Sequence, residues 1–415
     1  MKTTRPLLVL GAGIAGITAA LEAAEAGAEV VLVERDPTIG GRVVRSRSYF
    51  PKMCPPTCGM EINIRRIERN PRVRVVTSAR VTAAEQTGDG WKVTLTIAPA
   101  FVNGRCTACG DCEAACVTEV ADLFNLGMKK VKAIRLPHLH AWPHRYVFDR
   151  AACPDDEAHK IADACRYDAI DLDAAATTET LDVAAVVLAT GWQPYPLDRL
   201  PELGGSLQDV IANVEMERLA SPDGPTAGKI QRPSDGQPPA RVAFVQCAGS
   251  RDVNHLPYCS GVCCLASLKQ ATYVKEQLPE AEVTMYYIDR RTPGRNEDVL
   301  LKVAAMEGVR LVKGKVGQIE QSGGSLSLRV EDVEAGRVIQ AEADLVVLAT
   351  GMVPTSADDH LALFTRRDED GFALDDATAR VAVAGVARRP EDVASSVRDA
   401  TGAAARAVAA AAGRP

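Results

Sequence analysis

The chain has 415 residues, 47% of them hydrophobic and 25% charged, and its 48 basic and 54 acidic side chains give a formal net charge of −6. This composition predicts a globular protein of roughly two or three domains and excludes collagen-like, coiled-coil and wholly disordered chains. A mildly acidic chain binds phosphate backbones poorly, so we expect no nucleic-acid partner. No apolar run reaches the roughly 18–20 residues of a membrane span. Residues 7–10 run directly into glycines, which favours a strand over a signal peptide.

The first predicted elements are a strand, a glycine-rich turn, a helix and a second strand. The apolar residues 7–10 form the first strand, and the alanine-rich helix over 14–26 ends at Gly27. Further strands are expected at 30–33, 73–77 and 91–97, the last of them antiparallel because its hydrophobicity alternates.

Residues 98–180 differ in character, because they carry six of the twelve cysteines and four of the six histidines. We interpret them as an inserted metal-binding domain. The elements expected after it are a buried strand at 184–189, a long surface connection over 196–240, a strand, helix and strand at 242–246, 262–277 and 283–288, a buried strand at 345–349 and an Ala/Arg-rich helix over 392–412.

The first chemical motif is Gly11-Ala12-Gly13-Ile14-Ala15-Gly16, between the first strand and the first helix. In a dinucleotide-binding turn the first glycine permits the tight turn, the second lets the pyrophosphate approach the backbone, and the third lets helix and strand pack closely. The helix N-terminus then faces the phosphates. Glu34 closes the second strand, where its carboxylate is expected to accept ribose hydroxyls.

Several later glycines indicate which dinucleotide binds. Gly40-Gly41-Arg42 follows Glu34, and two apolar strands end in Ala-Thr-Gly, at 189–191 and 349–351. Together these resemble the flavoproteins with two dinucleotide-binding domains, which hold FAD. In that family a glycine followed by a helix N-terminus reaches the flavin; Gly385 matches, although Val386 replaces the usual acidic residue. The candidate FAD-binding residues are Gly11, Gly13, Ile14, Ala15, Gly16, Glu34, Arg35, Gly40, Gly41, Arg42, Val81, Ala189, Thr190, Gly191, Gly351, Gly385, Asp392 and Val393.

The second α/β unit lacks the glycine loop that NAD(P)H binding requires. Cys247 stands where the first glycine is expected, and Cys259, Cys263 and Cys264 follow at separations of 12, 4 and 1. Four thiolates can ligate one [4Fe–4S] cluster. The alternative is a set of buried structural cysteines.

A third motif, Cys106-x2-Cys109-x2-Cys112-x3-Cys116, has the spacing of bacterial ferredoxins, with Val117 in place of the usual proline. Its partner motif is eroded: if Cys165 is its last cysteine, the other three positions hold Asp155, Ala158 and Ile161. We therefore expect one [4Fe–4S] cluster on four of the cysteines, namely Cys106, Cys109, Cys112 and Cys165.

Four cysteines remain without an assigned role. Cys54 and Cys58 are a candidate flavin-facing redox dithiol, or they join Cys116 and Cys153 to hold a third cluster. The alternative is that they are inert or partner-facing thiols. No acid–base triad is evident, so no catalytic residue is assigned.

At this point the sequence resembles a known family, the HdrA-type flavoproteins of heterodisulfide reductases. The resemblance is carried by Gln246-Cys247-Ala248-Gly249-Ser250-Arg251-Asp252 and Tyr258-Cys259-Ser260-Gly261-Val262-Cys263-Cys264. Segments 50–59, 166–171 and 232–236 are closer to the HdrA-like flavoproteins of quinone-interacting membrane-bound oxidoreductase complexes. The resemblance covers essentially the whole chain.

This resemblance implies an electron-transfer subunit with FAD and two [4Fe–4S] clusters, passing electrons between a quinone pool and adenylylsulfate reductase in dissimilatory sulfur metabolism. It also implies a heme-bearing membrane subunit, which alone meets the quinone, together with a second HdrA-like flavoprotein subunit. The protein would be cytoplasmic and bound peripherally, through partners, to the inner face of the membrane.

Two other functions stay open. One is a heterodisulfide-reductase-type flavin subunit, with or without electron bifurcation. The other is an NAD(P)H-dependent disulfide reductase with Cys54 and Cys58 as its redox pair, which would need the missing glycine loop.

The expected fold class is α/β, a Rossmann-like flavoprotein with two dinucleotide-binding domains and an inserted ferredoxin-like iron–sulfur domain. The expected parts are the FAD-binding domain at 1–97, the ferredoxin-like insertion at 98–180, the second part of the FAD-binding domain with its connection at 181–240, a second Rossmann-like domain carrying a cysteine site at 241–348, and the C-terminal part of the FAD-binding domain at 349–415.

Overall fold

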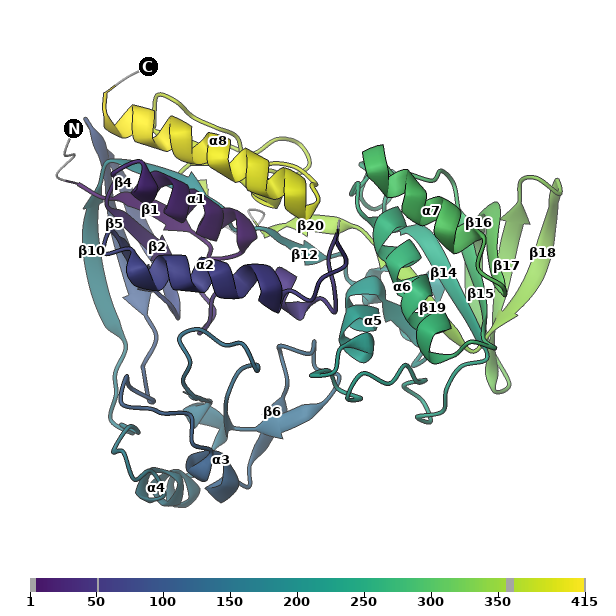
Figure 1. Cartoon of the computed structure of the whole chain (residues 1–415), viewed down its shortest axis with the longest axis horizontal. Coiled ribbons are helices and arrows are strands. Elements are labelled where there is room, and N and C mark those ends of the chain that lie inside the picture. The colour runs from purple at the N-terminus through teal and green to yellow at the C-terminus, as the bar shows by residue number, and fades with distance from the viewer. Residues whose placement is uncertain (1–4, 51, 356–361, 414–415) are drawn as a thin grey trace.

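The computed structural model describes residues 5–50, 52–355 and 362–413 (Figure 1). Its first domain is built on a parallel five-stranded sheet of order β21-β11-β1-β2-β3. The central strands are apolar on both faces, which is typical of parallel sheets covered on both sides. The strands are β1 (Leu7–Leu10), β2 (Val30–Val33), β3 (Val73–Val76), β11 (Ala185–Leu188) and β21 (Val381–Val383).

Helices cover one face of this sheet and a small antiparallel sheet covers the other. On the helical face, α1 (Ile14–Glu25) lies beside α8 (Val393–Ala411), with α2 (Thr57–Arg69) next to it (Figure 1). The alanines of α1 and α8 are buried against each other, because small side chains let the two helices approach closely. The opposite face packs against a sheet of order β10-β5-β4, formed by β4 (Ala79–Thr87), β5 (Gly90–Ile97) and β10 (Thr177–Val183).

The second domain contains a seven-stranded mixed sheet of order β13-β19-β14-β15-β16-β17-β18. Its parallel strands are β13 (Val210–Ala212), β14 (Arg241–Ala248), β15 (Glu282–Tyr287) and β19 (Leu345–Thr350), and β16 (Val309–Ser322) joins them to the antiparallel β17 (Ser325–Asp332) and β18 (Arg337–Ala343). One face is covered by α5 (Asn213–Ala220), α6 (Cys263–Gln277) and α7 (Glu297–Ala304). The short strands β12 (Trp192–Pro194) and β20 (Met352–Pro354) pair where the chain crosses between the domains.

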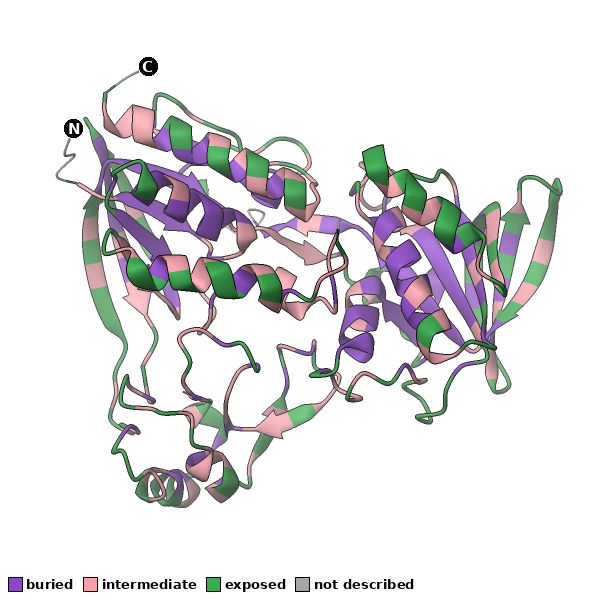
Figure 2. Cartoon of the chain, viewed as in Figure 1, coloured by how far each residue is buried: buried purple, intermediate pink, exposed green. Residues whose placement is uncertain are grey.

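The insertion is a separate small lobe between β5 and β10 (Figure 1). It contains α3 (Asp111–Ala115), α4 (Asp155–Asp163), β6 (Glu119–Ala121), β7 (Lys130–Lys132), β8 (Ile134–Arg135) and β9 (Val147–Phe148). Figure 2 shows buried residues concentrated in the two large sheets and in α1, α5 and α6, whereas the insertion is mostly half-buried or exposed. Small domains with a sparse core commonly rely on metals or cross-links, so this lobe is a natural place for a cluster.

The predicted strands at 7–10, 30–33, 73–77, 91–97, 184–189, 242–246, 283–288 and 345–349 and the helices at 14–26, 262–277 and 392–412 are present, with ends that differ by a few residues. Strand β4 and the hairpin extension β16–β18 were not expected. The boundary at 180 falls inside β10, which pairs with β5 from Thr177 onward. The stretch 196–240 is not simply a surface connection, because β13 joins the second sheet and α5 buries Met216 and Leu219 there.

A buried arginine joins the three parts of the chain. Arg218 of α5 is 1% exposed and donates to Asn125 Oδ1 of the insertion (2.8 Å) and to the Arg45 carbonyl of the first domain (2.9 Å). It also pairs with Asp223 at 2.8 Å. Phe124 lies between the guanidinium groups of Arg218 and Arg45, with ring-centroid distances of 4.8 and 5.4 Å. These contacts fix the insertion and the second domain against the loop that follows β2.

Replacing Arg218 with leucine is expected to destabilise the protein by about 3–5 kcal/mol, because it leaves buried partners without their charge. Chemical denaturation followed by circular dichroism measures this change. Arg241→Leu is the matched control: Arg241 pairs with Asp344 at 2.8 Å but is more exposed, and its loss should cost about 1 kcal/mol. Equal losses in the two variants would contradict a special role for the junction.

Among the residues that the structure describes, no helix has both the length and the apolar character needed to cross a membrane.

Candidate cofactor sites

The glycine loop after β1 has the geometry of a phosphate cradle. Gly11 has φ +94°, and a Cβ there would lie 2.5 Å from the Ala189 carbonyl oxygen. A Cβ at Gly16 would lie 1.7 Å from the Gly11 carbonyl oxygen. Both glycines are therefore required by packing. A Cβ at Gly13 would instead meet nothing nearer than Gly41 Cα at 3.9 Å, so the space in front of Gly13 is open to a ligand.

The start of α1 leaves its amide groups available to an anion. Gly13 is the N-cap, no side chain caps the helix, and the first turn has no acidic residue. Ile14 and Ala15 open this helix, so their amides face the open space at Gly13. The arrangement fits the pyrophosphate of a dinucleotide.

Glu34 is buried beneath this loop and binds the backbone. Its Oε2 accepts from the Ala12 amide (2.7 Å) and its Oε1 from the Asp36 amide (2.9 Å). Burial raises the pKa of this carboxyl, and the amide hydrogen bonds oppose that shift. Glu34 therefore supports the loop directly, while its contact with a ribose stays a prediction.

The C-terminal segment closes over the same loop. Gly385 has φ +61°, and a Cβ there would lie 2.8 Å from Ala15 Cβ. Its amide donates to Asp399 of α8 (2.8 Å), and Asp392 caps α8 by accepting from the Ser395 amide (2.6 Å). Val386, at the position of the family's acidic residue, is 7% exposed and packs inward. The α8 N-terminus, with Asp392 and Val393, is thus placed close to the glycine loop.

Other candidate FAD residues have different surroundings. The Thr190 hydroxyl, between Ala189 and Gly191, is buried without a hydrogen-bond partner, which leaves it free for a ligand. Arg42 donates to the Trp192 carbonyl (2.7 Å) and stacks on that ring, and burial lowers its pKa to about 9. Arg35 lies 3.9 Å from Asp36.

Two candidates face away from the cradle. A Cβ on Gly351 would meet Ser250 Oγ at 2.4 Å, so this glycine packs against the cysteine loop of the second domain. The Val81 side chain belongs to the core between the sheets, and its backbone alone is available to a ligand. The expectation of direct contact with FAD is therefore wrong for the Val81 side chain.

A hollow of ≈ 820 Å³ lies between the α8 N-terminus and the cysteine loop. Its size is typical of ligand and cofactor pockets. It is lined from the first domain by Arg389, Glu391, Asp392 and Ser395 and from the second domain by Gly261.

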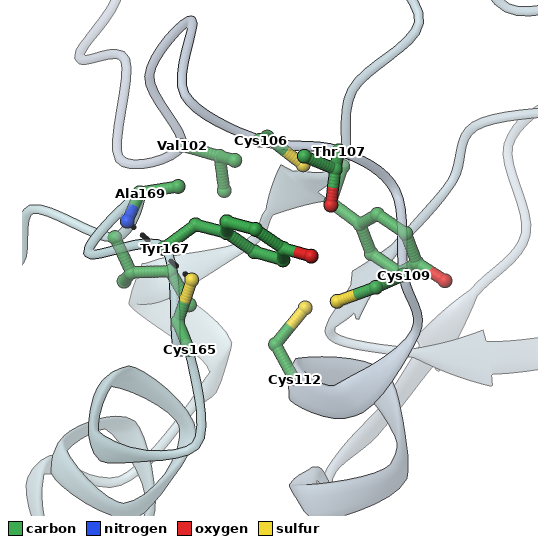
Figure 3. A pocket seen from close by; sticks show the side chains of 10 residues that line it. Val102, Cys106, Thr107, Cys109, Cys112, Cys165, Tyr167 and Ala169 are labelled. Carbon is green, nitrogen blue, oxygen red and sulfur yellow. Dashed lines mark hydrogen bonds between the residues drawn. The ribbon is translucent and has the colours of Figure 1, made fainter.

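The four cysteines predicted for the insertion cluster line one pocket. Cys106, Cys109, Cys112 and Cys165 surround a pocket of ≈ 300 Å³, and Figure 3 shows their sulfur atoms around a common hollow beside Tyr167. The Ala108 amide donates to Cys106 Sγ and the Ala169 amide to Cys165 Sγ, each at 3.4 Å. Such N–H···S contacts are typical of cluster ligands, whose charge they stabilise.

Burial raises the pKa of Cys112 to about 12, with further contributions from Cys106 and Cys165. A thiol set that resists ionisation on its own favours a bound cation to hold it as thiolate. In the described part of the chain, no three His, Cys, Asp or Glu side chains converge on one point as a single metal ion requires. A [4Fe–4S] cluster needs no such convergence, because each cysteine binds its own iron, so the residues fit a cluster.

The second half of the ferredoxin-like motif is filled by side chains. Cys116 and Cys153 are 3% and 4% exposed, in the core of the insertion with Ala158 and Ile161. The Glu157 carboxylate accepts from the Val117 amide (2.6 Å) and from the Thr118 amide (2.8 Å). These contacts lower the pKa of Glu157 to about 2, after the larger effect of the Thr118 hydroxyl. This filling favours one cluster in the insertion.

The four leftover cysteines are not brought together. Cys54 and Cys58 lie at the start of α2, beside Tyr49, whose pKa is raised by burial and by these two thiols. Cys116 and Cys153 lie in the separate lobe of the insertion. A third cluster on these four residues is therefore not supported, because the two pairs belong to different parts of the fold.

The cysteines of the second domain gather at the carboxyl end of β14. Burial raises the pKa of Cys263, and the neighbouring Cys264, Cys247 and Cys259 raise it further. Cys247 has φ +58°, a left-handed conformation that is costly for a non-glycine residue and is common at functional sites.

The sulfur atoms of this group also contact the surrounding backbone. Cys263 Sγ donates to the Thr350 carbonyl (3.6 Å), Cys264 Sγ donates to the Asp289 carbonyl (3.5 Å), and Cys259 Sγ accepts from the Gly261 amide (3.4 Å). Four mutually close thiols again fit an iron–sulfur cluster.

Sequence reasoning missed a buried ion pair near the loop that follows β2. Lys269 of α6 lies 3.0 Å from Glu217 of α5 and donates to the Ser48 carbonyl (2.6 Å). Tyr273 OH is 2.5 Å from Ser48 Oγ. No motif marks these residues, and the one available signal is a lysine on the inward face of an otherwise buried helix.

Comparison with known proteins agrees with this geometry. Residues 6–100 match the family model described as FAD dependent oxidoreductase. The chain is 35% identical over 98% of its length to the A2 iron–sulfur subunit of the CoB–CoM heterodisulfide reductase of Methanopyrus kandleri, and covers 64% of that protein. It is 33% identical over 96% of its length to the corresponding HdrA-type subunit of the H2:CoB–CoM heterodisulfide, ferredoxin reductase of Methanothermobacter marburgensis, and covers 63% of it.

Solved structures show the same fold. Thioredoxin reductase from Lactococcus lactis covers 99% of each chain with a TM-score of 0.55 at 13% identity, and that from T. acidophilum covers 97% of each with a TM-score of 0.53 at 14% identity. The chain is thus a homologue of the HdrA-type subunits of heterodisulfide reductases with the fold of an FAD-dependent oxidoreductase, and it spans less than two thirds of the length of those relatives.

Proposed function

We propose that this chain is an electron-transfer subunit of a multisubunit oxidoreductase of the heterodisulfide reductase type. FAD would be held by the glycine loop, Gly40–Gly41, Thr190 and the Gly385–α8 segment. One [4Fe–4S] cluster would be held by the insertion and one by the second domain. When bound, FAD exchanges two electrons together or singly and each cluster exchanges one. The observation that carries the proposal is the cysteine group standing where a nicotinamide dinucleotide would need glycines.

The residues of the chain perform a positioning task. The glycine loop and the start of α1 bind the pyrophosphate, and the hollow beside the α8 N-terminus leads from this site to the cysteine loop. The Arg218 junction fixes the insertion against the same part of the first domain. Electron passage depends on such fixed separations, and no acid–base group is needed for it.

The relatives reported above bear on which complex this protein serves. Their names state heterodisulfide reductases, in one case with H2 and ferredoxin, and none mentions a quinone or adenylylsulfate reductase. They therefore support our alternative expectation better than the quinone-linked one. The heme-bearing membrane subunit, adenylylsulfate reductase and peripheral membrane binding keep only the support of the sequence resemblance.

Anaerobic purification of the tagged protein from its native cells distinguishes these complexes. Further heterodisulfide-reductase-like subunits in the soluble fraction, in fixed stoichiometry, are the expected result. A heme-bearing membrane protein that purifies in equal amount would favour the quinone-linked complex.

The isolated, oxidised protein is expected not to react with NADH or NADPH. Cys247 and its neighbours occupy the position of the phosphate-binding loop, and cluster thiolates and sulfides would repel the anionic pyrophosphate. Anaerobic stopped-flow mixing, followed in the flavin bands, measures the reaction. Dithionite is the positive control for a reducible flavin. Flavin bleaching within seconds at micromolar nucleotide would restore the disulfide-reductase interpretation.

A further inference from the structure

Gln246, the residue before Cys247, is buried without hydrogen bonds. It is 6% exposed, and neither Oε1 nor Nε2 of its amide has a partner in the structure. A buried amide with both ends unpaired is unfavourable, and native proteins rarely keep one unless a bound group satisfies it. Such a violation of local packing rules is expected at functional sites.

The strand pattern indicates which way Gln246 points. In β14, Val242 and Phe244 pack in the core with α6, whereas Ala243 and Val245 pack in the core on the other face. The alternation of a strand therefore puts Gln246 on the α6 face. It stands at the carboxyl end of β14, where α6 begins with the cluster candidates Cys263 and Cys264.

Other unpartnered atoms gather at the same edge. The strands β13, β19 and β14 are parallel neighbours, so their carboxyl ends meet. Unpaired buried atoms follow these ends and lie on the first turns of α6: Asn213 Oδ1, Thr350 Oγ1, Ser267 Oγ and Gln270 Oε1. A buried polar edge of this kind points to a polar group held against it.

We propose that the Gln246 amide donates a hydrogen bond to the cluster held by Cys247, Cys259, Cys263 and Cys264 and thereby raises its reduction potential. The inference rests on the proposed function. A reduced cluster carries one more negative charge than an oxidised one, so a donor stabilises the reduced form more. Gln246 is thus a residue that tunes the cluster without ligating it.

The test is an EPR-monitored redox titration of the anaerobically purified, cofactor-loaded full chain. Gln246→Met keeps the length of the side chain and removes the donor. We expect the reduction equilibrium of one cluster to shift by about tenfold toward the oxidised form, which is 59 mV for a one-electron couple. The insertion cluster and the flavin should keep their potentials. The unfolding midpoint should be unchanged or higher, because an unpaired amide has been replaced by an apolar group.

Gln277→Met is the matched control in the same domain. Its amide is fully used, since Oε1 accepts from the Ile230 amide (3.0 Å) and Nε2 donates to the Gly228 carbonyl (2.8 Å). This variant should lower the unfolding midpoint and leave both clusters unshifted, the opposite of Gln246→Met. Should the methionine variant lose its cluster, the isosteric Gln246→Glu must show the same downward shift.

Unchanged potentials in both Gln246 variants, or a shift confined to the flavin, would overturn the inference. Wild-type protein purified anaerobically without iron and sulfide would overturn the proposed function as well, so the two failures are distinguishable.

Discussion

Replacing Gly13 with valine is expected to yield a folded protein without flavin absorbance. The structure makes this substitution a clean test, because a Cβ at Gly13 meets no protein atom nearer than 3.9 Å. The added side chain would extend into the space that the pyrophosphate must enter, next to the amides of Ile14 and Ala15. Flavin content per protein, from absorbance and from FAD released on denaturation, measures the effect, and we expect a loss of most of the flavin.

The neighbouring glycines separate binding from folding. Gly16→Ala would force a Cβ to 1.7 Å from the Gly11 carbonyl oxygen, so it should destabilise the fold itself by about 1–3 kcal/mol or more. Gly317→Val in β16 is the neutral control, since it too has open space around its Cβ position but lies far along the second domain. Wild-type flavin content in folded Gly13→Val would disprove the proposed FAD site.

The sequence patterns predicted the parts of this molecule that depend on local periodicity. The strands at Leu7–Leu10 and Val30–Val33 and the helix from Ile14 are present because unbroken apolar runs and glycine turns act within a few residues. The cysteine spacing likewise brought Cys106 and Cys165 to one pocket across a long separation, because the eroded motif leaves few partners.

What depends on tertiary contacts could not be predicted in this way. The short strand Val210–Ala212 is recognisable as part of the second sheet only through its pairing with β19. Glu34 was assigned to a ribose from its position, but its orientation toward the Ala12 amide follows from how β2 packs beneath the loop. The buried Arg218 joins three segments that are distant in sequence, so no local window contains its role.

The two sets of insertion cysteines give the second large expected effect. Cys165→Ala removes a pocket-lining thiol whose sulfur already accepts an amide hydrogen bond, so the insertion cluster should be lost or strongly destabilised. Cys153→Ala changes a thiol in the packed core beside Cys116, away from the pocket, so the cluster should persist. The cost there should be confined to about 1 kcal/mol of stability, as for a small core truncation.

Iron and acid-labile sulfide content and the EPR spectrum after reduction measure the two outcomes. The second-domain cluster provides the internal reference, because its ligands Cys247, Cys259, Cys263 and Cys264 are untouched in both variants. Its signal should remain when that of the insertion cluster disappears in Cys165→Ala. If Cys153→Ala abolishes the insertion signal while Cys165→Ala preserves it, the ligand set is wrong and the filled half-motif around Glu157 must open to hold metal. The predicted contrast arises because one cysteine faces a hollow with three other thiols, and the other faces alanine and isoleucine side chains.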